Sequence, residues 1–462
     1  MILKILWPRD HVKGNPFGGV SGYRSLKITF HSGSFNNLSS EEQKALDLLN
    51  DLARLDDVDA LSFDGSLFPK IVIDAEKINN NYIPIKIINP EGEAILFSGV
   101  SSSYIEPNCL AHLLGIYSSG EEDKYRPIKQ EILEAQSHGA LHRDLFVTNS
   151  PLLIKNRNKL ERLIICTPKE ALKITGLYLR MKGEFEWTTH IRGNCTFRSS
   201  RRTFYEYVSR GLLPSSWKFL SGIGTQKNRE ELIDLGWSVL NRYSRALQAR
   251  DEISRLFYLL DNASLIKDNT LDDQMAYHFD YFTVLLTAAL DAEALIINKV
   301  FELGLKDVDC GIRREKFINS LYKNNSACNL FTLLNEQEGY VNILFGLRNK
   351  IHSSSLDTDF SVPTNNPDEF LERVFEFNQD DHWGIQKQNV TLIKNHAAPV
   401  PSIKYTIDTY NLTHGLLIEG TKLIDLIMDK TIDGMDPNKL SNIMLTPPPD
   451  MIPYIETYLL LV

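Results

Sequence analysis

Cysteine is scarce in this sequence, and long apolar runs are missing. Only five of the 462 residues are cysteines, and no two of them have the C-x-x-C spacing. Neither a disulfide framework nor a cysteine zinc site is therefore predicted. No window of about 18 residues is both apolar and uncharged, which argues against a membrane-spanning helix. The apolar run before Pro8 is too short for a signal peptide, so we expect a cytoplasmic protein without membrane contact.

Positive charge is in deficit, because Lys and Arg number 50 against 59 Asp and Glu, which gives a net charge of −9. Such a balance does not favour binding of nucleic acid or anionic lipid over the whole surface. Any site for a polyanion must then be a local basic patch. The P-loop pattern G-x-x-x-x-G-K-[ST] is absent, as are internal repeats and low-complexity tracts. What is present is an ordinary globular composition, 43% hydrophobic and 24% charged.

The first 190 residues alternate segments typical of strands with segments typical of helices. The pair Ser39-Ser40 is predicted to cap the first helix, and Thr167 to cap one that begins with Pro168. This alternation favours an α/β layer in which strands pair in parallel. Strands are expected at 70–74, 83–88, 94–97, 145–148 and 163–166, and helices at 41–55, 126–141, 151–160 and 168–181.

From residue 228 onward, apolar residues recur at the three- and four-residue spacing of helices, which predicts a helical bundle. The expected helices are 228–260, 271–304, 313–324, 329–353 and 407–430, with a loop at 357–368. The chain is thus divided into an α/β domain (1–190), a junction (191–227), a helical domain (228–435) and a C-terminal tail (436–462).

The sharpest local signal is Arg348-Asn349-Lys350-Ile351-His352, near the end of the fourth predicted bundle helix. A helix places Arg348 and His352, four residues apart, on one face. A guanidinium grips phosphate through two donors, and an imidazole can take or give a proton near neutral pH. Together they fit metal-free RNA cleavage, with Asn349 orienting either group. The alternative is a solvated helix end, where both cations complement the helix C-terminus.

The segment FGLRNKIHSS resembles the signature of the HEPN superfamily, and the likeness extends over about 228–360. The resemblance implies a helical bundle that dimerises and a metal-independent ribonuclease of the antiphage-defence or toxin type. It gives Arg348 and His352 catalytic roles and Asn349 an accessory one, with no metal at this site. The gap between Arg348 and His352 is shorter than the family's usual one. Asp280 or Asp291, on the preceding long helix, are candidates to reach Arg348.

The segment 126–180 resembles the C-terminal half of a PIN-like nuclease domain, on the strength of Asp144-Leu-Phe-Val-Thr148 and the helices around it. The resemblance implies a divalent metal held by several carboxylates, which would activate water for phosphodiester attack. Asp144 is the first candidate ligand, with Glu131 or Glu134 beside it. An N-terminal acid is harder to place, and Asp64 and Asp74 are the options. The alternatives are a degenerate PIN-like fold used for recognition, or an α/β domain of other ancestry.

Basic and aromatic residues interleave in the segment 192–218, where Glu206 is the only acid. Guanidinium groups neutralise phosphates, and aromatic rings stack on unpaired bases. The alternative is a junction that packs its aromatics and pairs its arginines with acids. The candidate RNA-binding residues are Arg201, Arg202, Tyr205 and Lys350.

These patterns predict a PIN-like α/β domain joined to a HEPN-like helical bundle, acting as a metal-independent endoribonuclease on RNA. A homodimer is expected, with an antitoxin or regulatory protein as a further partner and no cofactor. One alternative is a non-catalytic sensor or scaffold that binds nucleic acid or a protein. The other is a metal-dependent nuclease in the N-terminal domain.

Overall fold

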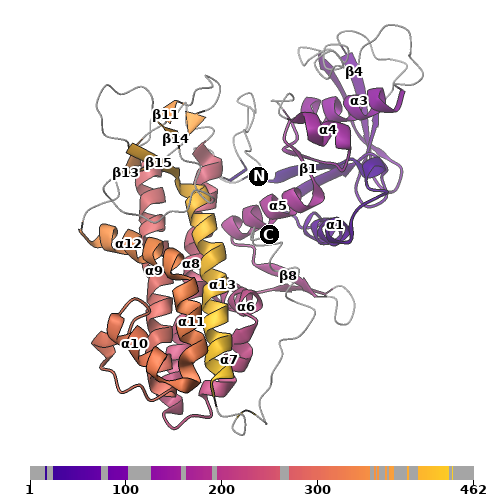
Figure 1. The fold of residues 1–462 in the computed structure, drawn as a ribbon. Coiled ribbons are helices and arrows are strands. Elements are labelled where there is room, and N and C mark those ends of the chain that lie inside the picture. Colours follow the sequence, from indigo (N-terminus) through magenta and orange to yellow (C-terminus); the bar gives the residue numbers. More distant parts are fainter. Residues whose placement is uncertain are drawn as a thin grey trace.

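A computed structural model gives the fold of the chain (Figure 1). The residues that it describes are 16–17, 24–73, 82–101, 126–157, 163–189, 195–260, 270–353, 358–359, 362–363, 370–371, 374–378, 393–394, 404–435 and 440.

The N-terminal part is built on a seven-stranded sheet with the order β5-β4-β3-β2-β1-β6-β7. The neighbouring strands β3, β2, β1, β6 and β7 pair in parallel, whereas β4 and β5 form an antiparallel extension beyond β3. Parallel pairing was predicted and holds for the five strands on that side of the sheet. The strands are β1 (Leu26–Phe30), β2 (Val58–Ser62), β3 (Lys70–Ile73), β4 (Tyr82–Ile88), β5 (Ala94–Ser101), β6 (Leu145–Val147) and β7 (Ile165–Cys166).

Helices cover both faces of this sheet (Figure 1). Side chains alternate along a strand, so Leu145 and Val147 of β6 pack with α1 and α5, while Phe146 packs with α3 and α4 on the other face. Thr167 caps α5 as predicted, and it does so through a capping box. Of the predicted pair Ser39-Ser40, Ser39 is the residue that caps α1. The four helices are α1 (Ser40–Leu52), α3 (Arg126–Ala140), α4 (Pro151–Asn156) and α5 (Pro168–Lys182).

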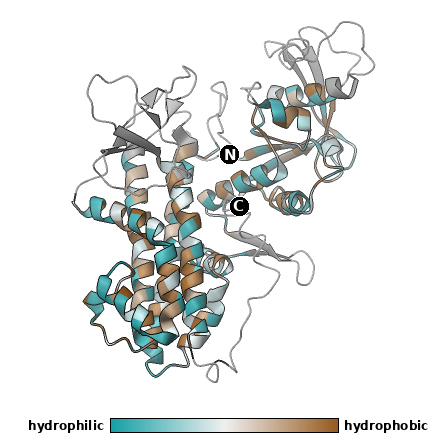
Figure 2. Cartoon of the chain, viewed as in Figure 1, coloured by the Kyte–Doolittle hydropathy of each residue, from teal (hydrophilic) through white to brown (hydrophobic). Residues whose placement is uncertain are grey.

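The C-terminal part is mostly helical, and its long helices turn their apolar faces toward one another (Figure 2). The predicted helix 329–353 is in fact two helices, because the chain turns at Gln337. The coarse prediction of an α/β sheet followed by a helical domain is confirmed. The helices are α8 (Arg229–Leu260), α9 (Thr270–Val300), α10 (Glu315–Lys323), α11 (Cys328–Glu336), α12 (Glu338–Ser353) and α13 (Thr409–Asp433).

The predicted junction, 191–227, contains two helices and one strand, which pairs with a strand just before the junction. Both helices belong to the helical core, since α6 packs on α8 and α7 packs on α13. Phe204 and Phe219 are 1% exposed and help to fill that core. The elements are β8 (Glu186–Thr189), β9 (Cys195–Arg198), α6 (Arg201–Leu212) and α7 (Ser215–Ile223).

Short strands lie between α12 and α13, and the first two of them fall in the segment 357–368 that was predicted to be a loop. Four of them form a small sheet in the order β10-β13-β15-β14, and the other two pair with each other. They are β10 (Thr358–Asp359), β11 (Val362–Pro363), β12 (Phe370–Leu371), β13 (Val374–Asn378), β14 (Ile393–Lys394) and β15 (Lys404–Asp408). Of the predicted tail 436–462, only residue 440 lies within the described residues. Among the helices that the structure describes, none has a stretch long and apolar enough to span a membrane.

A buried ion pair joins the two parts of the chain. Arg180 of α5 donates from Nε to Asp251 of α8 at 2.6 Å, and both side chains are inaccessible to solvent. The hydroxyl of Tyr205 in α6 donates to the same carboxylate at 2.6 Å. Burial alone would raise the pKa of Asp251, but Arg180 and Arg250 hold that pKa below its ordinary value. The α/β and helical parts therefore share one polar contact within a continuous core.

Glu293 of α9 is a buried carboxyl, and neither of its oxygens has a hydrogen-bond partner among the described residues. Burial, with Asp425 of α13 nearby, raises its pKa well above the ordinary value of 4.5. The Glu293 carboxyl therefore loses its proton at a lower pH in the unfolded chain than in the folded chain. The stabilisation that protonated Glu293 contributes is fully present below pH 4.5 and is lost as the pH rises toward the pKa of the folded state.

We expect Glu293→Gln to stabilise the protein at neutral pH, because the amide has the shape of the protonated acid and no charge to bury. The gain in the free energy of unfolding should be about 1–3 kcal/mol and should shrink toward zero in acid. Urea unfolding at several pH values measures it, with the exposed Glu231→Gln as control. A gain that does not depend on pH would contradict this account of Glu293.

Candidate functional site

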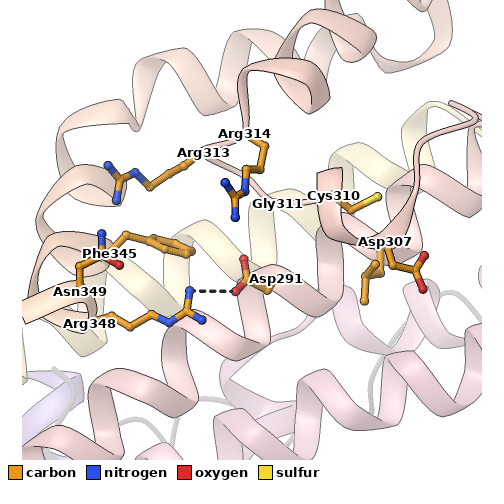
Figure 3. Close-up of a pocket in the computed structure, with 10 residues that line it drawn as sticks. Asp291, Asp307, Cys310, Gly311, Arg313, Arg314, Phe345, Arg348 and Asn349 are labelled. Carbon is orange, nitrogen blue, oxygen red and sulfur yellow. Dashed lines mark hydrogen bonds and ion pairs between the residues drawn. The ribbon is translucent and has the colours of Figure 1, made fainter. Parts of the chain in front are cut away.

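A cavity of about 560 Å³ opens between α9, α12 and the connection from α9 to α10 (Figure 3). Its volume is within the range of about 300–1,000 Å³ that is usual for ligand pockets. It is lined by Asp291, Leu295, Asp307, Cys310, Gly311, Arg313, Arg314, Phe345, Arg348 and Asn349.

Arg348 reaches into this cavity from α12 and meets Asp291 of α9. Their closest N and O atoms are 3.4 Å apart, and about a third of each side chain is exposed. The guanidinium also lies 5.8 Å from the centre of the Phe345 ring, which is close enough for a cation–π interaction. Arg348 is thus held by a carboxylate and a ring while part of its surface faces solvent. Of the two aspartates considered, Asp291 is the one that reaches it.

Asp280 lies eleven residues earlier on α9, or roughly 16 Å along the helix axis. One of its carboxylate oxygens is buried without a hydrogen-bond partner, and burial raises its pKa. It does not line the cavity.

The Asp291 carboxyl has a perturbed pKa. Burial raises this pKa, and the nearby Arg348, Arg314 and Arg242 only partly oppose the effect. Its charge is therefore easier to neutralise than that of an ordinary aspartate. Asp291 is a weaker counter-ion for the surrounding arginines than the sequence alone would indicate.

Cys310, at the far end of the cavity, is not an activated nucleophile. Its thiol lies 3.4 Å from the carbonyl oxygen of Lys306. Burial together with the charges of Asp307 and Asp309 raises the thiol pKa. The thiolate needed for nucleophilic attack is therefore disfavoured.

His352 lies one turn beyond Arg348 on the same helix, because α12 continues to Ser353. The side chain of His352 is exposed and is not among those that line the cavity. Lys350 is half-buried, and it lies two residues from Arg348, so the helix directs it to another face. The structure thus brings Arg348, Asn349 and Asp291 together, with His352 at the solvent-facing end of the same helix.

Asp144, the first of the predicted metal ligands, is held by other groups of the α/β part. It precedes β6 and is almost fully buried. Both of its oxygens accept hydrogen bonds from Arg24, at 2.6 and 2.7 Å, and the backbone N–H of Lys27 donates to one of them at 2.8 Å. This carboxylate is fully used in joining β6 to the start of β1.

Glu131 and Glu134 lie at the opposite end of β6, roughly 10 Å away along the strand. Glu134 is 3.1 Å from Nε2 of His31, and Nδ1 of His31 is 2.8 Å from the Thr148 hydroxyl. Glu131 accepts a hydrogen bond from Ser150 at 2.5 Å. The two glutamates therefore cannot share a metal with Asp144.

His31 was not among the residues that the sequence singled out. A parallel strand at Leu26–Phe30 would have placed this histidine beside Thr148 at the carboxyl edge of the sheet, since β1 and β6 are neighbours. That strand was not predicted.

Asp64 is exposed and belongs to a turn after β2. Although partial burial opposes the change, hydrogen bonds from Ser66, Ser32 and Ser62 lower its pKa. The other candidate, Asp74, lies outside the described residues. Within the part of the chain that the structure describes, no group of three His, Cys, Asp or Glu side chains is placed to hold a metal ion.

Tyr205 is not available to stack on a base, which corrects the prediction for this residue. Its side chain is buried and its hydroxyl is bound to Asp251. Arg201 and Arg202 are exposed, but each pairs with a glutamate: Arg201 with Glu252 at 3.2 Å and Arg202 with Glu206 at 2.6 Å. The segment therefore packs its aromatics and pairs these arginines, which was the alternative interpretation.

Comparison of the chain with family models, with curated proteins and with solved structures finds no match in any of the three.

Proposed function

We propose that this protein is a metal-independent endoribonuclease whose helical domain is HEPN-like and whose α/β domain is PIN-like. The observation that carries the proposal is the end of α12. There Arg348 lines the cavity, and the exposed His352 follows one helical turn later. A fixed cation and a proton carrier that are one helical turn apart suit attack on an RNA phosphodiester by its own 2′-hydroxyl.

In the proposed reaction, His352 accepts the proton of the 2′-hydroxyl while that oxygen attacks the adjacent phosphorus. The new bond to the 2′-oxygen forms as the bond to the 5′-oxygen breaks. Arg348 stabilises the negative charge that grows on the non-bridging oxygens, and Asn349, which lines the same cavity, orients the phosphate. The departing 5′-oxygen takes a proton from an imidazolium, leaving a 2′,3′-cyclic phosphate and a 5′-hydroxyl.

Two copies of the chain would supply the two proton carriers that this reaction uses. A single helical domain has one His352, and one imidazole cannot both hold the first proton and donate at the opposite side of the phosphorus. A homodimer with a composite cleft therefore forms part of the proposal. So do a cytoplasmic setting, RNA as substrate, a defence or toxin role, and an antitoxin or regulatory protein as partner.

The test is RNA cleavage in the presence of EDTA. We expect the wild type to cut RNA when divalent ions are chelated, and His352→Ala to lose about 10²–10⁴-fold in rate. The control is His142→Asn, an exposed histidine of the α/β domain whose φ of 50° asparagine tolerates. Equal cleavage by all three proteins would remove His352 from the mechanism.

A second candidate function is ligand recognition by the α/β domain. His31, Thr148 and Glu134 meet at the carboxyl ends of β1 and β6, where the strand order reverses direction. Open α/β sheets bind ligands at such a point. The sensor or scaffold function predicts RNA or partner binding that survives His352→Ala, without turnover.

A further inference from the structure

Three guanidinium groups line the cavity at the end of α12, although the chain as a whole carries a net charge of −9. Arg348 comes from α12, whereas Arg313 and Arg314 come from the connection that leads into α10 (Figure 3). Arg313 and Arg314 are exposed. Among the described residues, neither forms a salt bridge, so their charges are compensated less than that of Arg348.

The Phe345 ring positions two of these arginines. Its centre lies 5.7 Å from the guanidinium carbon of Arg313 and 5.8 Å from that of Arg348. Phe345 is itself 5% exposed and anchored in the core. Because the ring restrains these two arginine side chains, they lose less conformational entropy when an anion binds, which favours binding.

The cavity offers more donors than its own acceptors can use. Each guanidinium carries five N–H donors, and the carboxylate near Arg348 and Arg314 is Asp291. Its contact with Arg348 is long at 3.4 Å. Asp307 lies at the other end of the cavity in Figure 3. An incoming phosphate can therefore take the place of Asp291 and bind the guanidinium groups through two donors at a time.

We propose that Arg313 and Arg314 bind phosphates beside the one that is cleaved, so that the cavity holds the backbone of a single RNA strand and Asp291 is the counter-ion that this backbone displaces. The choice of RNA rests on the function proposed above. Arg313 and Arg314 are binding residues, whereas Arg348 and His352 carry the chemistry.

The experiment measures binding of a short, fluorescently labelled, single-stranded oligonucleotide with 2′-deoxyribose, which the proposed reaction cannot cut. We expect Arg313→Ala and Arg314→Ala each to weaken binding roughly tenfold. Each should also reduce the slope of log affinity against log salt by about 0.7. Asp291→Asn should tighten binding several-fold, because the competing charge is gone. The control is Arg54→Ala, an exposed arginine in the turn that follows α1, which should bind as the wild type does.

Opposite effects of the arginine and aspartate variants support the proposal. Unchanged binding in Arg313→Glu/Arg314→Glu, with a normal circular dichroism spectrum, would overturn it, and so would weaker binding by Asp291→Asn. Inorganic phosphate is the competitor: if it displaces the strand at an equal phosphate concentration, the cavity takes an isolated anion and the strand assignment fails. Strand binding as expected without RNA cleavage would instead remove the nuclease function and leave this site in place.

Discussion

Replacing Asp251 by alanine is expected to lower the free energy of unfolding by about 3–5 kcal/mol, because the change removes the carboxylate that pairs with the buried charge of Arg180. Both side chains have no exposed surface. The Tyr205 hydroxyl would lose its acceptor at the same time. Urea unfolding, followed by circular dichroism, measures the loss.

Two controls separate this effect from the general cost of removing an ion pair. Arg198 pairs with Glu184 on the surface, and Arg198→Ala should cost about 0–1 kcal/mol. The double variant Arg180→Met/Asp251→Leu should recover much of the loss, because a buried ion pair can be replaced by apolar side chains of similar volume. If Asp251→Ala and Arg198→Ala unfold at the same urea concentration, the contact between Arg180 and Asp251 does not stabilise the joining of the two parts of the chain.

Replacing Arg348 by alanine is expected to reduce the rate constant for RNA cleavage by about 10²–10³-fold, because one preorganised donor group is lost from the transition state. Arg348→Lys keeps the charge but loses the planar fork, so it should recover only part of the rate. The KM should change little by comparison, since Arg313 and Arg314 still line the cavity. Initial rates at several RNA concentrations separate the two constants.

The control for this prediction is Lys316→Ala. Lys316 is an exposed cation that pairs with Asp309 near the cavity but does not line it, so its loss should leave both constants near the wild-type values. A similar fall in rate for Lys316→Ala and Arg348→Ala would mean that only the local charge matters.

The helices were predictable because their caps and periodicity are local features. Ser39 and Thr167 mark the starts of α1 and α5 in the structure, as their hydroxyls and the residues after them indicated. The two central strands, Leu26–Phe30 and Val58–Ser62, were missed. Each has five residues with few β-branched side chains, and what makes them strands is pairing with distant partners.

The misassignment of Tyr205 has a clear physical origin. Phe204, Tyr205, Val208 and Leu212 recur at helical spacing, and all are buried. The basic residues between them suggested nucleic-acid binding, although the spacing of the apolar residues is that of a helix packed into a core.

Only the part of the candidate site that lies on one helix was predictable. Arg348, Asn349 and His352 are close in sequence, so their spacing on α12 followed from helix geometry. Arg313 and Arg314 reach the same cavity from a different segment, and no local pattern connects them with Arg348. The separation of Asp144 from the two glutamates by β6 depends in the same way on how distant segments pack, so it could not be read from the sequence.

The chemistry of the cut ends tests the central claim most directly. RNA cleaved by the wild type in EDTA is predicted to carry 5′-hydroxyl and 2′,3′-cyclic phosphate ends, because the attacking oxygen belongs to the RNA itself. Fragments with 5′-phosphate and 3′-hydroxyl ends, or cleavage that EDTA abolishes, would show attack by water with a metal and would contradict the roles of Arg348 and His352.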